Sequence, residues 1–112
     1  MSEFVGPFEV SSKLADAVYH VRFSHLWNGI ATRHSDTVDA KFFVDGRPVV
    51  IGLAHTGLVA FSRQEQRELT DREVSFLAAE FLRERLEQED ERPLYDVSQE
   101  EVLRLSINIG LC

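Results

Sequence analysis

The chain has 112 residues, of which 44% are hydrophobic and 28% are charged, and its formal net charge is −7. This length fits one domain, residues 1–112, and the composition excludes wholesale disorder. An acidic protein of this kind repels phosphate backbones, so nucleic acid is not expected as a partner, and the basic residues of the first half form only a faint stripe: Arg22, Arg33, Lys41 and Arg47.

The sequence shows no targeting or membrane-spanning segment. The first ten residues, MSEFVGPFEV, lack the basic start and apolar centre of a signal peptide. The longest apolar stretch, residues 49–54, is too short to span a bilayer, so no membrane partner is expected. Cys112 is the only cysteine, which excludes an intramolecular disulfide and a cysteine zinc site and favours a cytoplasmic location.

Residues 11–27 fit either a strand or a helix. Aromatic and β-branched residues dominate from residue 18 onward, and for this reason we favour the strand. One face of that strand would carry, at period two, Tyr19, Val21, Phe23 and Trp27. The helix alternative has Ser11 or Ser12 as its N-cap and Gly29 as its stop.

The strand alternative creates a candidate ligand site at a predicted two-residue turn, Asn28-Gly29. That turn would make His25 and His34 diagonal neighbours on one face, with Cβ atoms about 7 Å apart. Two such imidazoles can share a divalent metal when Asp36 or His55 supplies a third ligand. The helix alternative separates the pair. We therefore expect partly exposed histidines without a ligand, and we predict no metal.

The clearest hairpin lies within residues 37–55. Asp45-Gly46 favours a type I′ turn, in which both central residues need a positive φ. That turn sets a register with the cross-strand pairs Val44–Arg47, Phe42–Val49, Ala40–Ile51 and Val38–Leu53. These pairs form one mostly apolar face. Pro48 has no N–H to donate, so its strand is expected at a sheet edge, at least near the turn.

Helices dominate the second half of the chain. Residues 56–68 predict a short helix that begins at Thr56. A longer helix begins at Thr70, which forms a capping box with Glu73, and its apolar stripe consists of Val74, Leu77, Ala78, Phe81 and Leu82. A further capping pair, Ser98 with Glu101, starts a helix that Gly110 ends.

These elements predict an α+β fold. The expected architecture is a small antiparallel sheet of two hairpins, the second at residues 38–54, packed against two to three C-terminal helices.

His55 and Thr56 mark a junction between a strand and a helix. A helix N-terminus presents free N–H groups to anions, so both residues could help to hold a carboxylate or a phosphate. The simpler explanation, which we favour, is that Thr56 only caps its helix. The candidate ligand-binding set is therefore His25, His34, His55 and Thr56, with no catalytic residue assigned and no cofactor expected.

No phosphate loop, nucleophile elbow or zinc-protease motif is present in the sequence. We therefore favour a non-enzymatic binding or accessory module that acts through a surface. Its candidate interface residues are Phe43, which points away from the apolar face of its hairpin, with Pro48 and Val50 on the expected edge strand. The expected partner is a second copy of the chain or another protein. The alternative is a small enzyme or ligand-binding domain built on the histidines.

Overall fold

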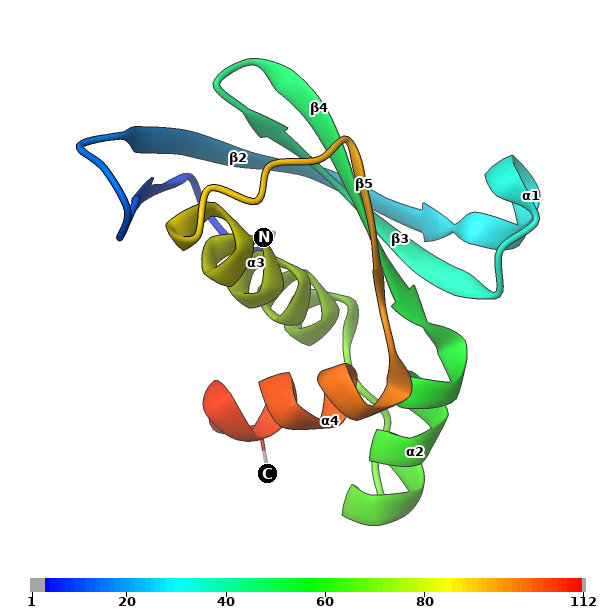
Figure 1. Ribbon diagram of the computed structural model, residues 1–112. Helices are drawn as coiled ribbons and strands as arrows, with labels where there is room; N and C mark the ends of the chain where they lie inside the picture. Colours follow the sequence, from blue (N-terminus) through cyan, green and yellow to red (C-terminus); the bar gives the residue numbers. More distant parts are fainter. Residues whose placement is uncertain (1–3, 112) are drawn as a thin grey trace.

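The computed structural model of the protein describes residues 4–111 (Figure 1). Its strands and helices confirm the α+β class, but the sheet is mixed and has five strands where two antiparallel hairpins were expected. In chain order the elements are β1 (Phe8–Ser11), β2 (Val18–Asn28), α1 (Gly29–Arg33), β3 (Thr37–Val44), β4 (Arg47–Ala54), α2 (His55–Glu65), α3 (Asp71–Glu87), β5 (Leu94–Val97) and α4 (Gln99–Asn108). The strands follow one another across the sheet in that order, and no helix within residues 4–111 is long and apolar enough to cross a membrane.

The β3–β4 hairpin has the predicted register at all four cross-strand pairs. Asp45 and Gly46 have φ angles of 49° and 83°, as a turn with two left-handed residues requires. The apolar face that this register creates is fully buried at Ala40, Phe42, Val44, Ile51 and Leu53. Turn chemistry and strand alternation therefore agree, and the prediction for this hairpin is confirmed.

Helices α3 and α4 lie on one side of the sheet, which we call the inner face (Figure 1). The buried side chains of β2–β5 form one hydrophobic cluster with the apolar stripe of α3 and with Val102 and Leu105 of α4. We call the opposite side the outer face. Neither α3 nor α4 covers it, and α1 lies over one end of it. The fold therefore has two layers, with one sheet face open.

The predicted starts of α3 and α4 are confirmed. Thr70 accepts a hydrogen bond from the Glu73 N–H at 3.1 Å, and Glu73 accepts one from the Thr70 N–H at 2.9 Å, which completes the capping box. Ser98 caps α4 by accepting from the Glu101 N–H at 3.3 Å. Gly110 follows α4 with a φ of 81°, the left-handed conformation that glycine adopts readily.

Helix α2 begins one residue earlier than predicted, at His55. Its N-cap is Ala54, which offers no side-chain hydrogen bond, so the prediction that Thr56 caps this helix is wrong. The β4 strand runs directly into the helix, and its last residue becomes the cap. Phe61 faces the core as expected and is fully buried.

Residues 18–28 form the strand β2, which confirms the favoured alternative from residue 18 onward, whereas residues 12–17 form the loop between β1 and β2. Its pairing with β3 shifts between Phe23 and His25, where Ser24 is an extra residue, a β-bulge. After the bulge Trp27 pairs with Asp39 on the outer face, so it does not share a face with Phe23 as predicted. A single inserted residue reverses the alternation, and periodicity alone does not reveal it.

The link from β2 to β3 is the helix α1, so the predicted two-residue turn at Asn28-Gly29 is wrong. Asn28 is the N-cap of α1, and its side-chain oxygen accepts a hydrogen bond from the Ile30 N–H at 2.9 Å. His34 ends the helix in the left-handed conformation, with a φ of 54°. Asparagine serves well as an N-cap, and here that preference prevails over its equally common use in tight turns.

Strands β1 and β5 have no counterpart among the predicted elements. Each has four residues, which is too short for a periodic pattern to distinguish a strand from a loop. β1 forms an antiparallel hairpin with the start of β2, and β5 runs parallel to β4 after the crossover through α2 and α3.

Candidate binding surface

The outer face gathers side chains from all five strands. Because successive residues of a strand point to opposite sides, the register of the sheet decides which residues lie on this face. By that register they include Glu9, His20, Arg22, His25, Trp27, Asp39, Lys41, Phe43, Pro48, Val50, Leu94 and Asp96. The inner face carries the hydrophobic core, whereas this face mixes aromatic, cationic and anionic groups.

Phe43 lies at the centre of a patch that includes all three predicted interface residues. It pairs with Pro48 across the β3–β4 hairpin, and Val50 pairs with Lys41 two residues away on the same face. The Arg22 guanidinium carbon lies 4.5 Å from the centre of the Phe43 ring, and the Lys41 ammonium nitrogen lies 5.2 Å from it. We call these five residues the Phe43 patch. Phe43 is half-buried and Pro48 is exposed.

The predicted edge position of the strand with Pro48 is correct only near the turn. β4 is an internal strand, because β5 pairs with it from Val50 to Leu53. The Val50 N–H donates to the Pro93 carbonyl at 2.9 Å, so this donor is already paired within the chain. Among the described residues, no residue of β5 pairs with Pro48, because the pairing of β4 with β5 begins at Val50. Side chains, and not a free strand edge, therefore define this surface.

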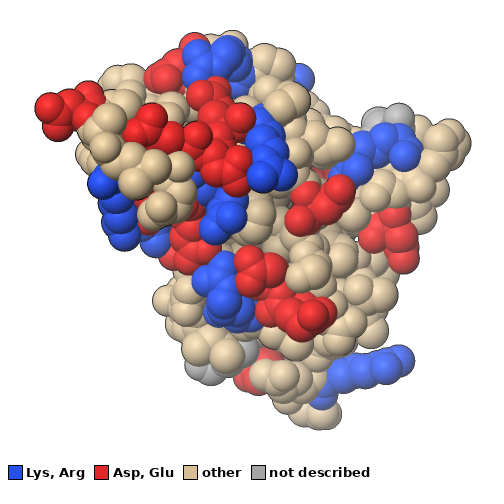
Figure 2. Space-filling view, in the orientation of Figure 1, with Lys and Arg blue, Asp and Glu red and all other residues tan. Residues whose placement is uncertain are grey.

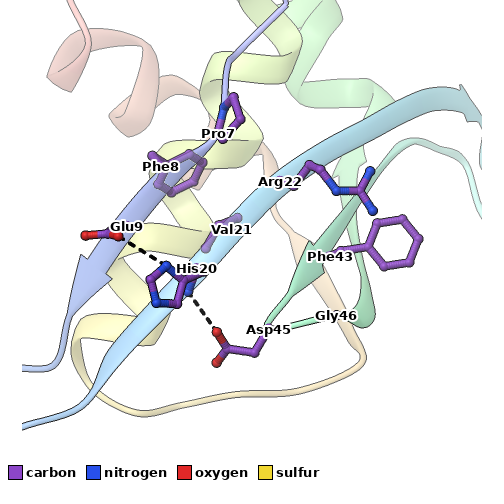
Figure 3. Close-up of a pocket in the computed structure, with 9 residues that line it drawn as sticks. All are labelled: Pro7, Phe8, Glu9, His20, Val21, Arg22, Phe43, Asp45 and Gly46. Atoms are coloured by element: carbon purple, nitrogen blue, oxygen red, sulfur yellow. Dashed lines mark hydrogen bonds and ion pairs between the residues drawn. The ribbon is translucent and has the colours of Figure 1, made fainter.

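A shallow pocket of about 450 Å³ adjoins the Phe43 patch. Figure 3 shows Arg22 and Phe43 on one side of it and Glu9 with His20 on the other. The His20 ring lies 3.1 Å from the Glu9 carboxylate, and the His20 backbone N–H donates to Asp45 at 2.9 Å. Both carboxylates at this rim are therefore already engaged by neighbours.

The other end of the outer face holds a buried ion pair. Asp39 is fully buried, and its two oxygens accept hydrogen bonds from Arg33 at 2.8 and 2.9 Å. The Thr37 hydroxyl donates to the same carboxylate at 2.7 Å. The hydrogen bonds that Arg33 donates to Asp39 raise the pKa of Arg33. A Cβ at Gly52 would lie 2.1 Å from the Arg33 guanidinium, so glycine is needed for the cation to lie against β4. The cluster fixes α1 on the sheet.

The structure does not place His25 and His34 as the predicted diagonal pair. His25 pairs with Lys41 on β2, and its ring hydrogen-bonds to the Ser24 hydroxyl at 2.8 Å and packs against Trp27. His34 is exposed at the end of α1. The helix α1 takes the place of the turn on which that pairing depended.

His55 and Thr56 are exposed in the first turn of α2. The His55 N–H donates to the Asp36 carbonyl at 3.0 Å, which joins α2 to the loop before β3. Both residues line a shallow pocket on α2 together with Arg63 and Gln99. An anion at this position stays a prediction from the sequence.

Within residues 4–111 no group of three or more His, Cys, Asp or Glu side chains is arranged to hold a metal ion. Cys112 lies outside the described residues. Trp27, which was expected on the apolar face, contacts His25 on the outer face with ring centres 5.0 Å apart. The outer face is therefore more aromatic than the sequence predicts.

Two features of the surface were not found from the sequence. The first is that Arg22 and Lys41 both lie over the Phe43 ring. Nothing in the sequence singled out these two among the basic residues of the first half. Lys41 shares the predicted face of β3 with Phe43 by strand alternation, but the position of Arg22 opposite Phe43 follows from the β2–β3 pairing, which the incorrectly predicted turn concealed. The second is the Arg33–Asp39 pair, which needs α1 to bring its partners together.

The chain matches no protein-family model, no curated protein and no solved structure.

Proposed function

We propose that the protein is a non-enzymatic binding module that holds another protein against the outer face of its sheet. The observation that carries the proposal is the Phe43 patch, which places an aromatic ring, Pro48 and Val50 on a sheet face that α3 and α4 leave open. Arginine and aromatic side chains are enriched in protein interfaces, and Arg22, Trp27 and Phe43 supply them here.

The shape of the surface favours a protein partner over a small ligand. Sites for small molecules enclose most of the ligand surface in a concave cavity. The pocket beside the Phe43 patch is shallow, and the rest of the patch is a sheet surface formed by three neighbouring strands. A partner with an extended segment would contact this surface over a larger area.

The electrostatics favour a different protein over a second copy of this chain. A two-fold dimer places the same patch of both copies in contact. The Phe43 patch would then bring the Arg22 and Lys41 side chains of two molecules together, and like charges in an interface oppose association. The proposal keeps the cytoplasmic setting that the single cysteine favours.

A random peptide library displayed on phage tests the proposal. We expect wild-type protein to select a recurring set of peptides whose binding the Phe43→Ser variant loses at least about tenfold. Phe76→Ser is the matched control, because Phe76 is a half-buried Phe under an arginine on α3. Equal loss in both variants, or no loss in Phe43→Ser, would contradict the proposal.

Sedimentation velocity tests the choice of partner. We expect a monomer across the accessible range of concentrations, because the unpaired cations of two patches repel each other. A concentration-dependent dimer that Phe43→Ser abolishes would assign the outer face to self-association instead.

A further inference from the structure

We infer that the segment bound at the outer face is an acidic protein segment that carries one apolar anchor residue. The inference rests on the proposed function and names the chemistry of its partner. Its starting point is the distribution of ion pairs in this acidic chain.

Eight of the twelve Lys and Arg side chains form an ion pair with a carboxylate within residues 4–111. Figure 2 shows one side of the molecule, on which many basic side chains lie directly beside acidic ones. The cations of the described residues that lack such a partner are Arg22, Lys41, Arg63 and Arg72. In a chain with 19 acidic residues, an unpaired cation occupies a place that carboxylates do not reach.

Arg22 and Lys41 are unpaired at the same place, and both lie over the ring of Phe43. The attraction between a cation and the face of an aromatic ring helps to hold the two side chains in position. The ring accepts no conventional hydrogen bond, so the N–H groups of both cations stay available for an acceptor. Figure 3 shows the Arg22 guanidinium directed toward the Phe43 ring.

The carboxylates that line the pocket beside these cations already have partners within the chain. Glu9 contacts the His20 ring, and Asp45 accepts from the His20 backbone N–H and lies 3.8 Å from Arg47. At the far end of the face, Asp39 is bound by Arg33. An incoming carboxylate therefore need not displace an acid of this chain to bind Arg22 and Lys41.

The number of unpaired cations favours an acidic protein segment over a nucleic acid. Strong phosphate-backbone binding uses about 6–10 phosphate contacts, whereas this face offers two unpaired Lys or Arg side chains. The net charge of −7 repels a polyanion as a whole, but one or two carboxylates at the patch are screened from more distant acids beyond a Debye length of about 8 Å.

The pocket beside the patch supplies the place for the apolar anchor. Pro7, Phe43 and Arg22 line it on the outer side, whereas Phe8, which also borders it, packs its ring against the core on the inner face. A segment with an apolar side chain in this pocket can place a neighbouring Asp or Glu against Arg22 and Lys41. Both contacts together distinguish this partner from a purely acidic chain.

Three synthetic peptides test the inference, each with one central Phe flanked by Glu, Gln or Lys at the same positions. In NMR titrations of the whole protein, we expect the Glu peptide to bind at least about tenfold more tightly than the Gln peptide, as two charge-assisted hydrogen bonds allow. The double variant Arg22→Glu, Lys41→Glu should reverse this preference in favour of the Lys peptide. The variant Arg63→Glu, Arg72→Glu changes the net charge equally at unpaired cations on α2 and α3, and it should keep the wild-type preference.

The outcomes separate the inference from the proposed function. Equal binding of the three peptides at the Phe43 patch would overturn the inference that the bound segment is acidic. It would still agree with the proposed function, in which the outer face binds another protein. Tighter binding of a single-stranded DNA oligonucleotide than of the Glu peptide would overturn it in favour of nucleic acid. Loss of the preference in both double variants would show that net charge, and not the patch, determines binding. Failure of every probe to shift outer-face resonances, together with equal library selection by Phe43→Ser, would contradict the proposed function itself.

Discussion

Asp39 is a carboxylate with no exposed surface, and it depends on Arg33 for most of its compensation. Removing one partner of a buried pair leaves the other as an uncompensated charge, which costs more than the pair gains. We expect Arg33→Ala to lower the free energy of unfolding by about 3 kcal/mol, measured by urea denaturation. Arg33→Met with Asp39→Asn should lose much less, because the Asn can still bond to Thr37. Equal losses would contradict this assignment.

A substitution at Gly52, which pairs with Asp39 from the neighbouring strand β4, also tests the cluster of Arg33 and Asp39. The added methyl of Gly52→Ala would lie 2.1 Å from the Arg33 guanidinium and 3.0 Å from Asp39, so the cation must move off the strand. We expect destabilisation of about 1–3 kcal/mol by urea denaturation, with little further loss when Arg33→Ala is added. Gly6→Ala is a suitable control, because its Cβ would contact nothing within 4 Å. Additive losses would show that Gly52 acts independently of Arg33.

At the residue scale, the sequence identified side chains whose role depends on near neighbours. Asp45-Gly46 specified its own turn, and Thr70 with Glu73 specified its own cap. Arg33 and Asp39 are six residues apart, but nothing in their spacing predicts the helix α1 that brings them together. The role of Phe43 followed from alternation within one hairpin, whereas the approach of Arg22 required the pairing with β2.

The first turn of helix α3 contains Glu73, an acid whose ionisation stabilises the fold. Hydrogen bonds from Arg67 lower the pKa of Glu73 from its ordinary 4.5 to about 2, with a further contribution from the Thr70 cap. Since the folded-state pKa is the lower one, this contribution is complete above about pH 4.5 and is lost as the pH falls toward 2.

We expect Glu73→Gln to reduce the pH dependence of unfolding between pH 5 and pH 2, because Gln can form the capping box but does not titrate. Urea denaturation at several pH values measures the effect. Some dependence should remain, since hydrogen bonds from Arg104 lower the pKa values of Glu84 and Glu101 as well. Identical profiles for wild type and Glu73→Gln would contradict the role of Glu73.

At the element scale, long segments with an apolar stripe were predictable, and short irregular ones were not. The stripe of α3 is long enough for helical spacing to be unambiguous. α1 has five residues, and the bulge at Ser24 has one, so each changes the chain path without a periodic signal. Those two features decide where His25, Trp27 and His34 lie. The histidine site therefore depended on the least predictable part of the chain.

The whole molecule is a two-layer fold in which one face of the sheet carries the core and the other stays open. The sequence predicted the α+β class but not the mixed sheet, because the parallel β5 pairs with β4 across a crossover of some 40 residues that local patterns do not reveal. The open face is a consequence of that topology: α2 and α3 connect β4 to β5, and α3 packs with α4 on the inner side.

The most direct test of the outer face as the binding surface is a map of backbone amide shifts in NMR spectra of the protein with a library-selected peptide. We expect the largest shifts at Arg22, Lys41 and Phe43 and their neighbours on β2–β4, with α3 and α4 little changed. Largest shifts on α3 and α4, with the Phe43 patch unaffected, would contradict it.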